Sequence, residues 1–287
     1  MKKWVFLFIF VMLLGYGAFQ QKAEVASLFP TNKPNQAQEV SSQEKSQTIK
    51  VAKDQIYQGN LILVNKVYPL HQQGVRSDVI QLSQHKELVK GYGLYDNNIQ
   101  LSKSVVQAFL KLVGAAEQDK VRNFSITSGY RGLKEQAKLY DEMGSDYALP
   151  AGYSEHNLGL SLDIGSTLME MNHAPEGKWL NQNAWKYGFI LRYPKDQTAI
   201  TGIQYEPWHY RYVGLPHSAI MQKQHLVLEQ YLDYVKKEKN ITFKVDGEKY
   251  EVSYYAVSNN MTIKVPANRR YEISGNNMDG IIVTVYP

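Results

Sequence analysis

Histidines and carboxylates that could bind a metal or move protons are concentrated in three short segments of this 287-residue chain. The segments read SGYR at 128–131, SEHNLGLSLD at 154–163 and EPWHYR at 206–211. Two histidines and two carboxylates among otherwise apolar, strand-like residues need partners, because burying such groups unpaired is costly. A divalent zinc ion would meet that need, since zinc binds imidazole nitrogen and carboxylate oxygen and keeps a fourth position open to water in catalytic sites.

The spacing of these side chains suits one site. His156 and Asp163 lie seven residues apart, so a loop and a strand could bring both to one cation, and His209 would complete the set from another strand. Glu206 stands three residues before His209, and in a flat strand the two would point to opposite faces. A bend or bulge at Pro207 could turn Glu206 back toward the metal. There its carboxylate could take a proton from water and deliver it to a leaving amine.

Arg131 follows a strand-like segment, where it could hold a substrate carboxylate or stabilise a developing oxyanion. Each of these residues also has an ordinary interpretation. Arg131 could be a solvated charge or a salt-bridge partner, Ser154 a helix cap and Trp208 a core residue. The other histidines are interpreted as surface or structural residues: His71, His85, His173, His217 and His225. The HExxH metalloprotease pattern is absent.

Hydrophobic periodicity predicts the elements that position these segments. Helical spacing is found at 101–116, 133–143, 179–187 and 218–237, and short apolar strands at 123–128, 160–164, 189–193 and 208–213. After residue 239 apolar and polar residues alternate at 241–245, 250–254, 261–265 and 281–285. Residues 240–287 are therefore predicted to form a small β-rich appendage, either a separate module or an extension of the main sheet.

The N-terminus predicts export. Two lysines precede an apolar run at 4–19, the pattern of a signal peptide or an uncleaved signal anchor. Residues 20–55 are polar with few large apolar groups, which predicts a disordered tether ahead of a catalytic domain at 56–239. The chain has no cysteine, so a lipoprotein anchor, a disulfide framework and a thiolate metal site are excluded.

Composition adds weaker constraints. Apolar residues make up 44% and charged residues 21% of the chain, as in ordinary globular proteins. The net charge of +5 favours anionic surroundings such as a cell wall or membrane surface only slightly, because the basic residues are scattered. We expect no nucleic-acid partner, and we expect a monomer.

The three segments, read as SGYR, SEHNLGLSLDI and EPWHYRYVG, resemble the VanY-type D,D-carboxypeptidases and their D-alanyl-D-alanine peptidase relatives. Those proteins carry S-x-H-x-x-G-x-x-x-D and E-x-W-H. The resemblance spans about residues 60–235 and includes LILVN at its start and GFILRYP in its middle. The appendage after residue 240 departs from the common pattern of the family, so its role stays open.

The resemblance implies an α+β fold with a central, largely antiparallel sheet flanked by helices. It implies zinc held by His156, Asp163 and His209, a catalytic Glu206, and Arg131 assisting at the scissile carbonyl. It places the side chains of three further residues at the substrate pocket: Gln136, Ser154 and Trp208. The implied activity is removal of the terminal D-alanine from peptidoglycan stem peptides, outside the cytoplasm of a bacterium.

Three other functions are weighed against this one. An L,D-carboxypeptidase or an endopeptidase on peptidoglycan peptides would keep the chemistry and move the cleaved bond. A serine penicillin-binding enzyme would need a complete motif set, but no K-T-G follows the S-x-x-K matches at Ser42 and Ser83. A non-catalytic wall-binding module would be expected to have degenerate ligand positions, and here all four positions of the metal site are filled.

Overall fold

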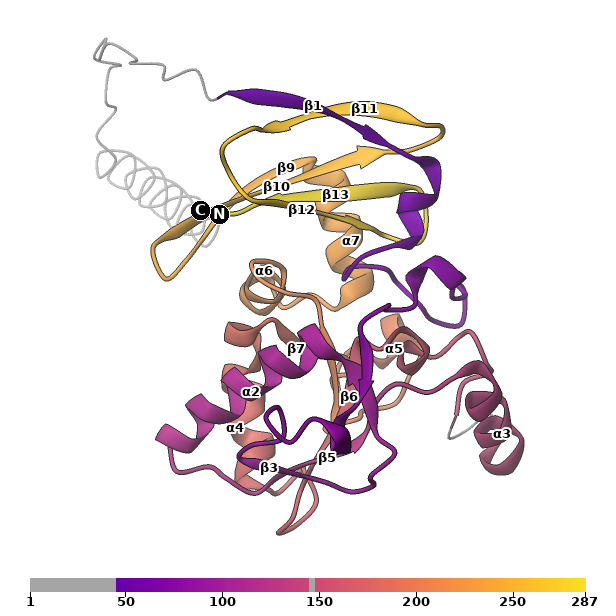
Figure 1. Ribbon diagram of the computed structural model, residues 1–287, viewed down its shortest axis with the longest axis vertical. Coiled ribbons are helices and arrows are strands. Elements are labelled where there is room, and N and C mark those ends of the chain that lie inside the picture. The colour runs from indigo at the N-terminus through magenta and orange to yellow at the C-terminus, as the bar shows by residue number, and fades with distance from the viewer. Residues whose placement is uncertain (1–44, 145–147) are drawn as a thin grey trace, which may run out of the picture. The chain divides into compact units, whose positions relative to one another are not determined.

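In the computed structural model, which describes residues 45–144 and 148–287, a five-stranded sheet carries the three segments (Figure 1). In spatial order its strands are β3 (Tyr92–Leu94), β5 (Phe124–Ser128), β6 (Ser161–Ser166), β8 (His209–Tyr212) and β7 (Phe189–Leu191). The β3–β5 pair is parallel and the other neighbouring pairs are antiparallel. The predicted α+β class with a largely antiparallel central sheet is confirmed.

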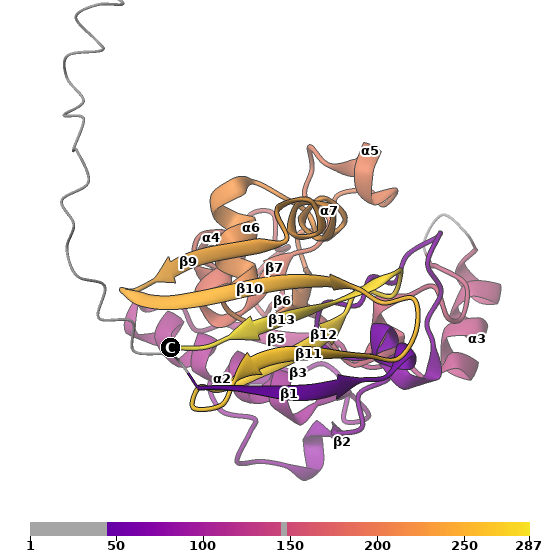
Figure 2. The ribbon, with the colours of Figure 1, turned by 90° about the horizontal axis from the view of Figure 1, so that it is seen from above.

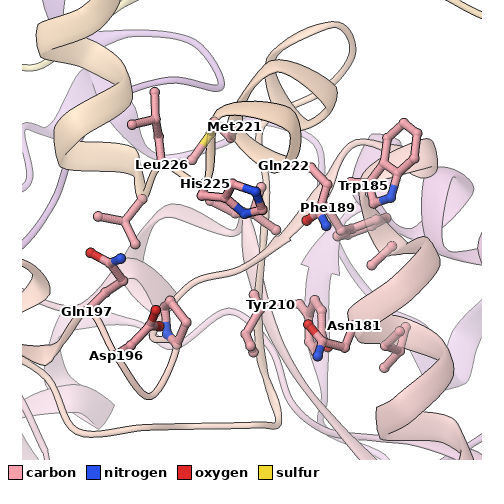
Figure 3. A pocket seen from close by; sticks show the side chains of 16 residues that line it. Asn181, Trp185, Phe189, Asp196, Gln197, Tyr210, Met221, Gln222, His225 and Leu226 are labelled. Atoms are coloured by element: carbon pink, nitrogen blue, oxygen red, sulfur yellow. The ribbon is translucent and has the colours of Figure 1, made fainter. Parts of the chain in front are cut away.

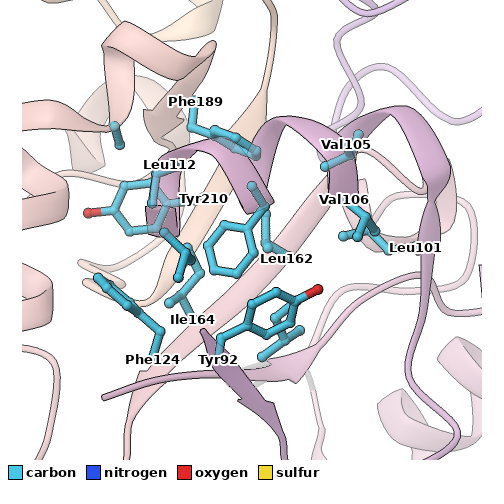
Figure 4. Packing of buried hydrophobic residues seen from close by; sticks show 14 of the residues in the cluster. Tyr92, Leu101, Val105, Val106, Leu112, Phe124, Leu162, Ile164, Phe189 and Tyr210 are labelled. Carbon is cyan, nitrogen blue, oxygen red and sulfur yellow. The ribbon is translucent and has the colours of Figure 1, made fainter. Parts of the chain in front are cut away.

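Helices pack around this sheet or lie between it and the C-terminal strands. Their bounds are α2 (Lys103–Gln118), α3 (Leu133–Met143), α4 (Pro175–Asn183), α5 (Thr198–Thr201), α6 (His217–Gln224) and α7 (Leu228–Glu238). Helix α2 buries an apolar stripe with spacings of three and four residues, including Val105, Phe109 and Leu112. This stripe shares one core with Leu162 and Ile164 of β6 (Figure 4). The core therefore fixes the strand on which Asp163 lies.

Short elements complete the region around the sheet. Strands β2 (Val79–Gln81) and β4 (Gln100–Ser102) pair with each other in antiparallel fashion. The 3₁₀ turns are η1 (Lys53–Tyr57), η2 (Gln72–Gly74), η3 (Leu82–Gln84), η4 (Glu155–Leu158) and η5 (Ala184–Tyr187). Within 45–144 and 148–287, no helix has the length and apolar character needed to cross a membrane.

The C-terminal residues form a second, four-stranded antiparallel sheet. Its order is β12 (Tyr271–Gly275), β13 (Gly280–Val285), β10 (Glu248–Ala256) and β9 (Asn240–Val245). Strand β11 (Met261–Pro266) leaves this sheet and pairs with β1 (Ser46–Val51). Seen from above, β1 and β11 lie side by side at the side of the sheet away from α7 (Figure 2). The predicted β-rich C-terminal part is confirmed.

Strand β13 explains how this sheet is covered on both faces. Its side chains alternate, so Ile282 packs with α7 residues such as Leu232, whereas Ile281 and Val283 pack with Val51 of β1. Both faces are buried, which is why GIIVTV reads as a nearly continuous apolar run. The sheet thus shares a core with the helices that follow β8 and is not an isolated appendage.

The predicted tether ends earlier than residue 55. Residues 46–51 form β1, paired with β11 from Ser46↔Pro266 to Val51↔Met261, and η1 follows directly. The segment SQTIKV is too polar to suggest a strand, but β11 satisfies its backbone groups and Val51 is buried. The predicted signal segment at 1–19 and the tether up to residue 44 lie outside the described residues.

The single helix predicted at 218–237 is wrong, because the chain forms α6 and α7 instead. His225 adopts a left-handed conformation with φ 53° and ends α6, and Leu226 N donates to Met221 O at 3.0 Å. Val227 is extended at the start of α7. Apolar spacing continues across the break because Leu226 and Leu228 still pack in the core, so periodicity alone did not reveal it.

Candidate metal centre

The sheet register brings the predicted ligands together. Asp163 on β6 lies opposite His209 on β8, and His156 lies on the 3₁₀ turn η4 that leads into β6. His209 Nδ1 is 3.0 Å from Asp163 Oδ1, and His156 Nε2 is 3.4 Å from the same oxygen. One ligand atom from each residue lies within 4.8 Å of the others, so the three form a candidate metal site.

The orientation of His156 is set by a backbone carbonyl. Its Nδ1 donates to Gly129 O at 2.6 Å, which leaves the Nε2 lone pair facing Asp163. Gly129 cannot be replaced without movement, because an added Cβ would lie 2.1 Å from Gln100 O. The glycine of the SGYR segment therefore allows the close approach that orients the first ligand.

His209 is oriented from its other nitrogen. Its Nε2 lies 3.5 Å from Glu155 Oε2, an ion-pair distance too long for a well-formed hydrogen bond. Ser161 Oγ donates to the same Glu155 oxygen at 3.1 Å. Nδ1 of His209, on the other side of the ring, faces Asp163 and the ligand cluster.

Two buried arginines hold Glu155 in place. Arg192 Nε and Arg211 Nη1 each donate to Glu155 Oε1 at 2.8 Å, and all three side chains are inaccessible to solvent. Burial alone would raise the pKa of Glu155, but Arg192 and Arg211 hold it well below its usual range. Arg192 also pairs with Glu229 of α7 at 2.6 Å, which connects the site to the helix under the C-terminal sheet.

These supporting residues were not identified from the sequence. A signal was present, because Arg192 and Arg211 stand in or next to short apolar strands and a buried arginine requires a carboxylate partner. Glu155 stands next to His156, a predicted ligand, which made it one of the candidate partners.

The charges of the cluster suit a cation. Burial raises the pKa of Asp163, but His156 and His209 outweigh it and hold that pKa far below the usual range. Burial lowers the pKa of His156. For His209, burial works in the lowering direction, but Asp163 and Glu155 raise its pKa to about 9. Two imidazoles and an ionised carboxylate, all largely buried, are the donor set that zinc prefers.

Glu206 approaches the cluster through the predicted bend. Residues 207–208 form a turn in which His209 N donates to Glu206 O at 3.2 Å. Glu206 Oε2 then lies 3.7 Å from His209 Nδ1, with its side chain 28% exposed. Burial is the main cause that raises the pKa of Glu206. A carboxylate with a raised pKa beside a candidate metal site can exchange protons with water there.

Arg131 is held beside the cluster with a defined orientation. Its Nε donates to Gln136 Oε1 at 2.9 Å, and its Nη1 donates to Ser128 Oγ at 2.9 Å. Its own backbone N donates to His156 O at 3.0 Å, so a hydrogen bond joins the arginine directly to the first ligand. The guanidinium plane is therefore fixed before any substrate arrives.

The three predicted substrate residues differ in their geometry. Gln136 is 1% exposed and uses both amide atoms within the protein, with Arg131 and with Leu149 O. Ser154 is 5% exposed, and its Oγ accepts from His156 N at 3.3 Å as an N-cap. Trp208 is 41% exposed. The polar atoms of Gln136 and Ser154 thus bond within the protein. Substrate contact stays a prediction for all three residues, and the exposed Trp208 fits it best.

The three candidate ligands line one open cavity of about 580 Å³ together with Glu206, Arg131 and the three predicted substrate residues. Another cavity, of about 210 Å³, is lined by Tyr210, Phe189, Met221 and neighbouring residues (Figure 3). That cavity contains none of the cluster residues. Ser83 of the serine-enzyme alternative donates to Asn97 O at 2.7 Å and does not line the cluster's cavity, and Ser42 lies outside the described residues.

A buried His–Asp–His cluster with a carboxylate and an arginine in the same cavity defines a candidate hydrolytic metal site. Comparison with known proteins specifies the family. The VanY profile, D-alanyl-D-alanine carboxypeptidase, matches residues 98–215. A D-alanyl-D-alanine carboxypeptidase of Enterococcus faecium is 54% identical over 294 residues, covering 100% of this chain and 97% of that protein. The chain belongs to the VanY family of D-alanyl-D-alanine carboxypeptidases, and it is a carboxypeptidase.

Two solved structures are similar as well. The vancomycin resistance D,D-dipeptidase VanXYg, in complex with a D-Ala-D-Ala phosphinate analogue, has a TM-score of 0.75 and 32% identity, covering 85% of this chain and 100% of that one. A variant of the D,D-pentapeptidase VanY from a VanB-type resistance cassette, in complex with Zn(II), has a TM-score of 0.51 and 31% identity, covering 60% of this chain and 98% of that one. Because residues 1–239 make up less than 85% of the chain, the match with VanXYg extends into residues 240–287.

Proposed function

We propose that the protein is a zinc-dependent carboxypeptidase that removes the terminal D-alanine from peptidoglycan stem peptides ending in D-Ala-D-Ala. The observation that carries the proposal is the His156, Asp163 and His209 cluster with Glu206 3.7 Å from one of its ligands. Zinc is supported by the Zn(II) complex of a VanY relative, and the D,D-substrate by the 54% identical carboxypeptidase. We place the protein outside the cytoplasm, where this substrate lies.

The residues have separate tasks in this reaction. His156, Asp163 and His209 would hold the zinc ion, which when bound supplies Lewis-acid activation of the water and of the scissile carbonyl. Glu206 accepts a proton from the attacking water and then delivers it to the nitrogen of the departing D-alanine. Arg131, already fixed by Gln136 and Ser128, donates to the scissile carbonyl oxygen as negative charge develops there.

A panel of three soluble peptides tests the specificity. It contains a stem pentapeptide ending in D-Ala-D-Ala, the stem tetrapeptide that exposes the L,D-bond, and free D-Ala-D-Ala. We expect the fastest D-alanine release from the pentapeptide. Release from the tetrapeptide alone would assign the enzyme to the L,D-class, internal cleavage would indicate an endopeptidase, and no release from any peptide would favour a binding module.

A further inference from the structure

A second cleft, larger than the cavity of the metal centre, lies where the catalytic region meets the C-terminal sheet. Its volume is about 720 Å³, against about 580 Å³ for the cavity at the cluster. It is lined from one side by residues of α2, η5 and the end of β8, and from the other by residues of β10, β12 and β13. None of its lining residues lines the metal centre's cavity, so it is a separate site.

The cleft is positively charged. Four cationic side chains line it with a single carboxylate, Glu272. Arg76 is paired with Asp78 at 3.2 Å, and Arg270 is paired with Glu272. Lys111 and Lys186 are exposed and make no ion pair within 45–144 and 148–287, since Lys186 Nζ donates only to the neutral Asn183 Oδ1 at 2.9 Å. Two uncompensated lysines at one cleft favour an anionic ligand.

Tyrosine side chains also contribute to the lining of the cleft. Four of them line the cleft, each partly buried: Tyr187, Tyr212, Tyr250 and Tyr286. The rings of Tyr250 and Tyr286 contact each other with centroids 5.7 Å apart, and the Arg270 guanidinium lies 4.2 Å from the Tyr286 ring centroid. A tyrosine presents a rigid apolar face and a polar hydroxyl at low entropic cost, which suits the faces and hydroxyl edges of sugar rings.

Strand β8 connects this cleft to the metal centre. His209 stands at its first position and Tyr212 at its last, so their Cα atoms are about 10 Å apart at the usual rise of a strand, and their side chains point to opposite faces of the sheet. A polymer molecule that occupied both sites would therefore pass around the edge of the sheet. Sugar rings would occupy the tyrosine-lined cleft while a stem peptide occupied the cluster.

We infer that this cleft binds a segment of the peptidoglycan strand away from the cleaved bond. The sugar rings pack on the tyrosines, and carboxylates of neighbouring stem peptides bind Lys111 and Lys186. The inference rests on the proposed function, because that function makes the polymer the substrate. It assigns the C-terminal sheet the task of completing a second binding site, which raises the local concentration of the polymer at the metal centre.

The test compares polymeric and soluble substrates. We expect the double variant Lys111→Glu, Lys186→Glu to lose about 10-fold in kcat/KM on purified peptidoglycan that carries pentapeptide stems, with kcat/KM on the soluble pentapeptide unchanged. The matched control Lys178→Glu, Lys237→Glu changes the same net charge at exposed lysines outside the cleft, and it should behave like the wild type on both substrates. Equal activity of the cleft variant and the control on the polymer would overturn the inference.

Pelleting of the protein with isolated cell walls separates the remaining outcomes. We expect the wild type to pellet with walls stripped of teichoic acid, and the cleft variant to pellet about 10-fold more weakly. Binding that requires teichoic acid would mean that phosphate groups are the ligand, which contradicts a peptidoglycan site. Pelleting measures binding and does not depend on catalysis. Failure to cleave the soluble pentapeptide would therefore reject the proposed function, and the pelleting result would still test the cleft.

Discussion

His209 lies between two carboxylates that face its two ring nitrogens, with Asp163 3.0 Å from Nδ1 and Glu155 3.5 Å from Nε2. Glu155 is not a candidate ligand itself, because its other oxygen accepts from Arg192 and Arg211. A carboxylate behind a ligating histidine fixes its tautomer and makes it a better donor. Glu155 is therefore a positioning residue for the metal site.

Glu155→Gln should weaken zinc binding by about 10–100-fold, the usual effect of losing such a partner. Zinc affinity is measured by competition with a chromogenic chelator. Glu176→Gln is the matched control, since Glu176 is also 1% exposed but accepts from Asn123 and Ser166 away from the cluster. Zinc affinity equal to that of the wild type in Glu155→Gln would contradict the positioning role.

Loss of the Glu155 charge leaves two buried arginines unpaired, which could prevent folding. Ser161→Ala avoids this, because it removes only the hydroxyl that donates to Glu155 Oε2 at 3.1 Å and keeps the ion pairs. We expect a smaller loss of zinc affinity, of a few-fold, with a thermal unfolding midpoint close to that of the wild type. No loss at all in this folded variant would also count against the role of Glu155.

Zinc binding should release about one proton at neutral pH. Without metal, Asp163 and Glu155 outweigh burial and raise the pKa of His209 to about 9, so this residue is protonated at pH 7 and must lose its proton to bind zinc. Burial lowers the pKa of His156, and the pKa of Asp163 is also low, so neither competes in this range. Apparent zinc affinity should rise about tenfold from pH 7 to pH 8. Calorimetry in buffers of different ionisation enthalpy counts the proton, and a pH-independent affinity would be the contrary result.

Arg131→Lys should lower kcat by about 10²–10³-fold with little change in KM. Lysine keeps the charge but loses the planar fork that Gln136 and Ser128 hold at 2.9 Å each. Gln136→Leu should lower kcat in the same direction by a smaller factor, because it leaves Arg131 in place but less well oriented. A raised KM with unchanged kcat in Arg131→Lys would assign this residue to binding the substrate carboxylate instead.

His217 connects α6 to α7 and to the C-terminal sheet, with Nδ1 2.6 Å from Tyr231 Oη and Nε2 2.9 Å from Thr284 Oγ1. Burial lowers its pKa from 6.5 to about 3. Below pH 6.5 the unfolded chain binds a proton that the folded protein does not, so His217 lowers the free energy of unfolding by about 1.4 kcal/mol per pH unit as pH falls toward 3.

His217→Gln removes this titration while keeping a donor and an acceptor. Its free energy of unfolding, measured by denaturant titration between pH 6.5 and pH 4.5, should fall less steeply than that of the wild type. Parallel pH profiles for the two proteins would show that His217 is not held neutral by burial.

Local patterns predicted the parts of this structure that depend on neighbouring residues. The helix expected at 133–143 has these same bounds in the structure, and the bend at Pro207 is present because a proline and a turn suffice to make it. The ligand cluster was predicted from the second and third segments, each of which supplies site residues only a few positions apart.

Features that depend on distant pairing were missed. Glu155 meets Arg192 and Arg211 across 37 and 56 residues, so the apolar strands around the two arginines suggest burial but do not identify their partner. Strand β1 is polar, so its composition resembled that of a tether. Its partner β11 lies more than 200 residues further along the chain, so no local pattern indicated the pairing. The cleft at the C-terminal sheet exists only because β10, β12 and β13 fold back against α2 and β8.

D-alanine release from the soluble pentapeptide, measured on one preparation before zinc removal, after it and after zinc is restored, tests the central claim most directly. We expect release to disappear with the metal and to return with about one zinc per chain, and Glu206→Gln to hold zinc while losing about 10²–10⁴-fold in kcat. Glu206 is the group concerned because its carboxylate lies 3.7 Å from a ligand nitrogen in the open cavity. Full release by protein shown by elemental analysis to be metal-free would contradict the account.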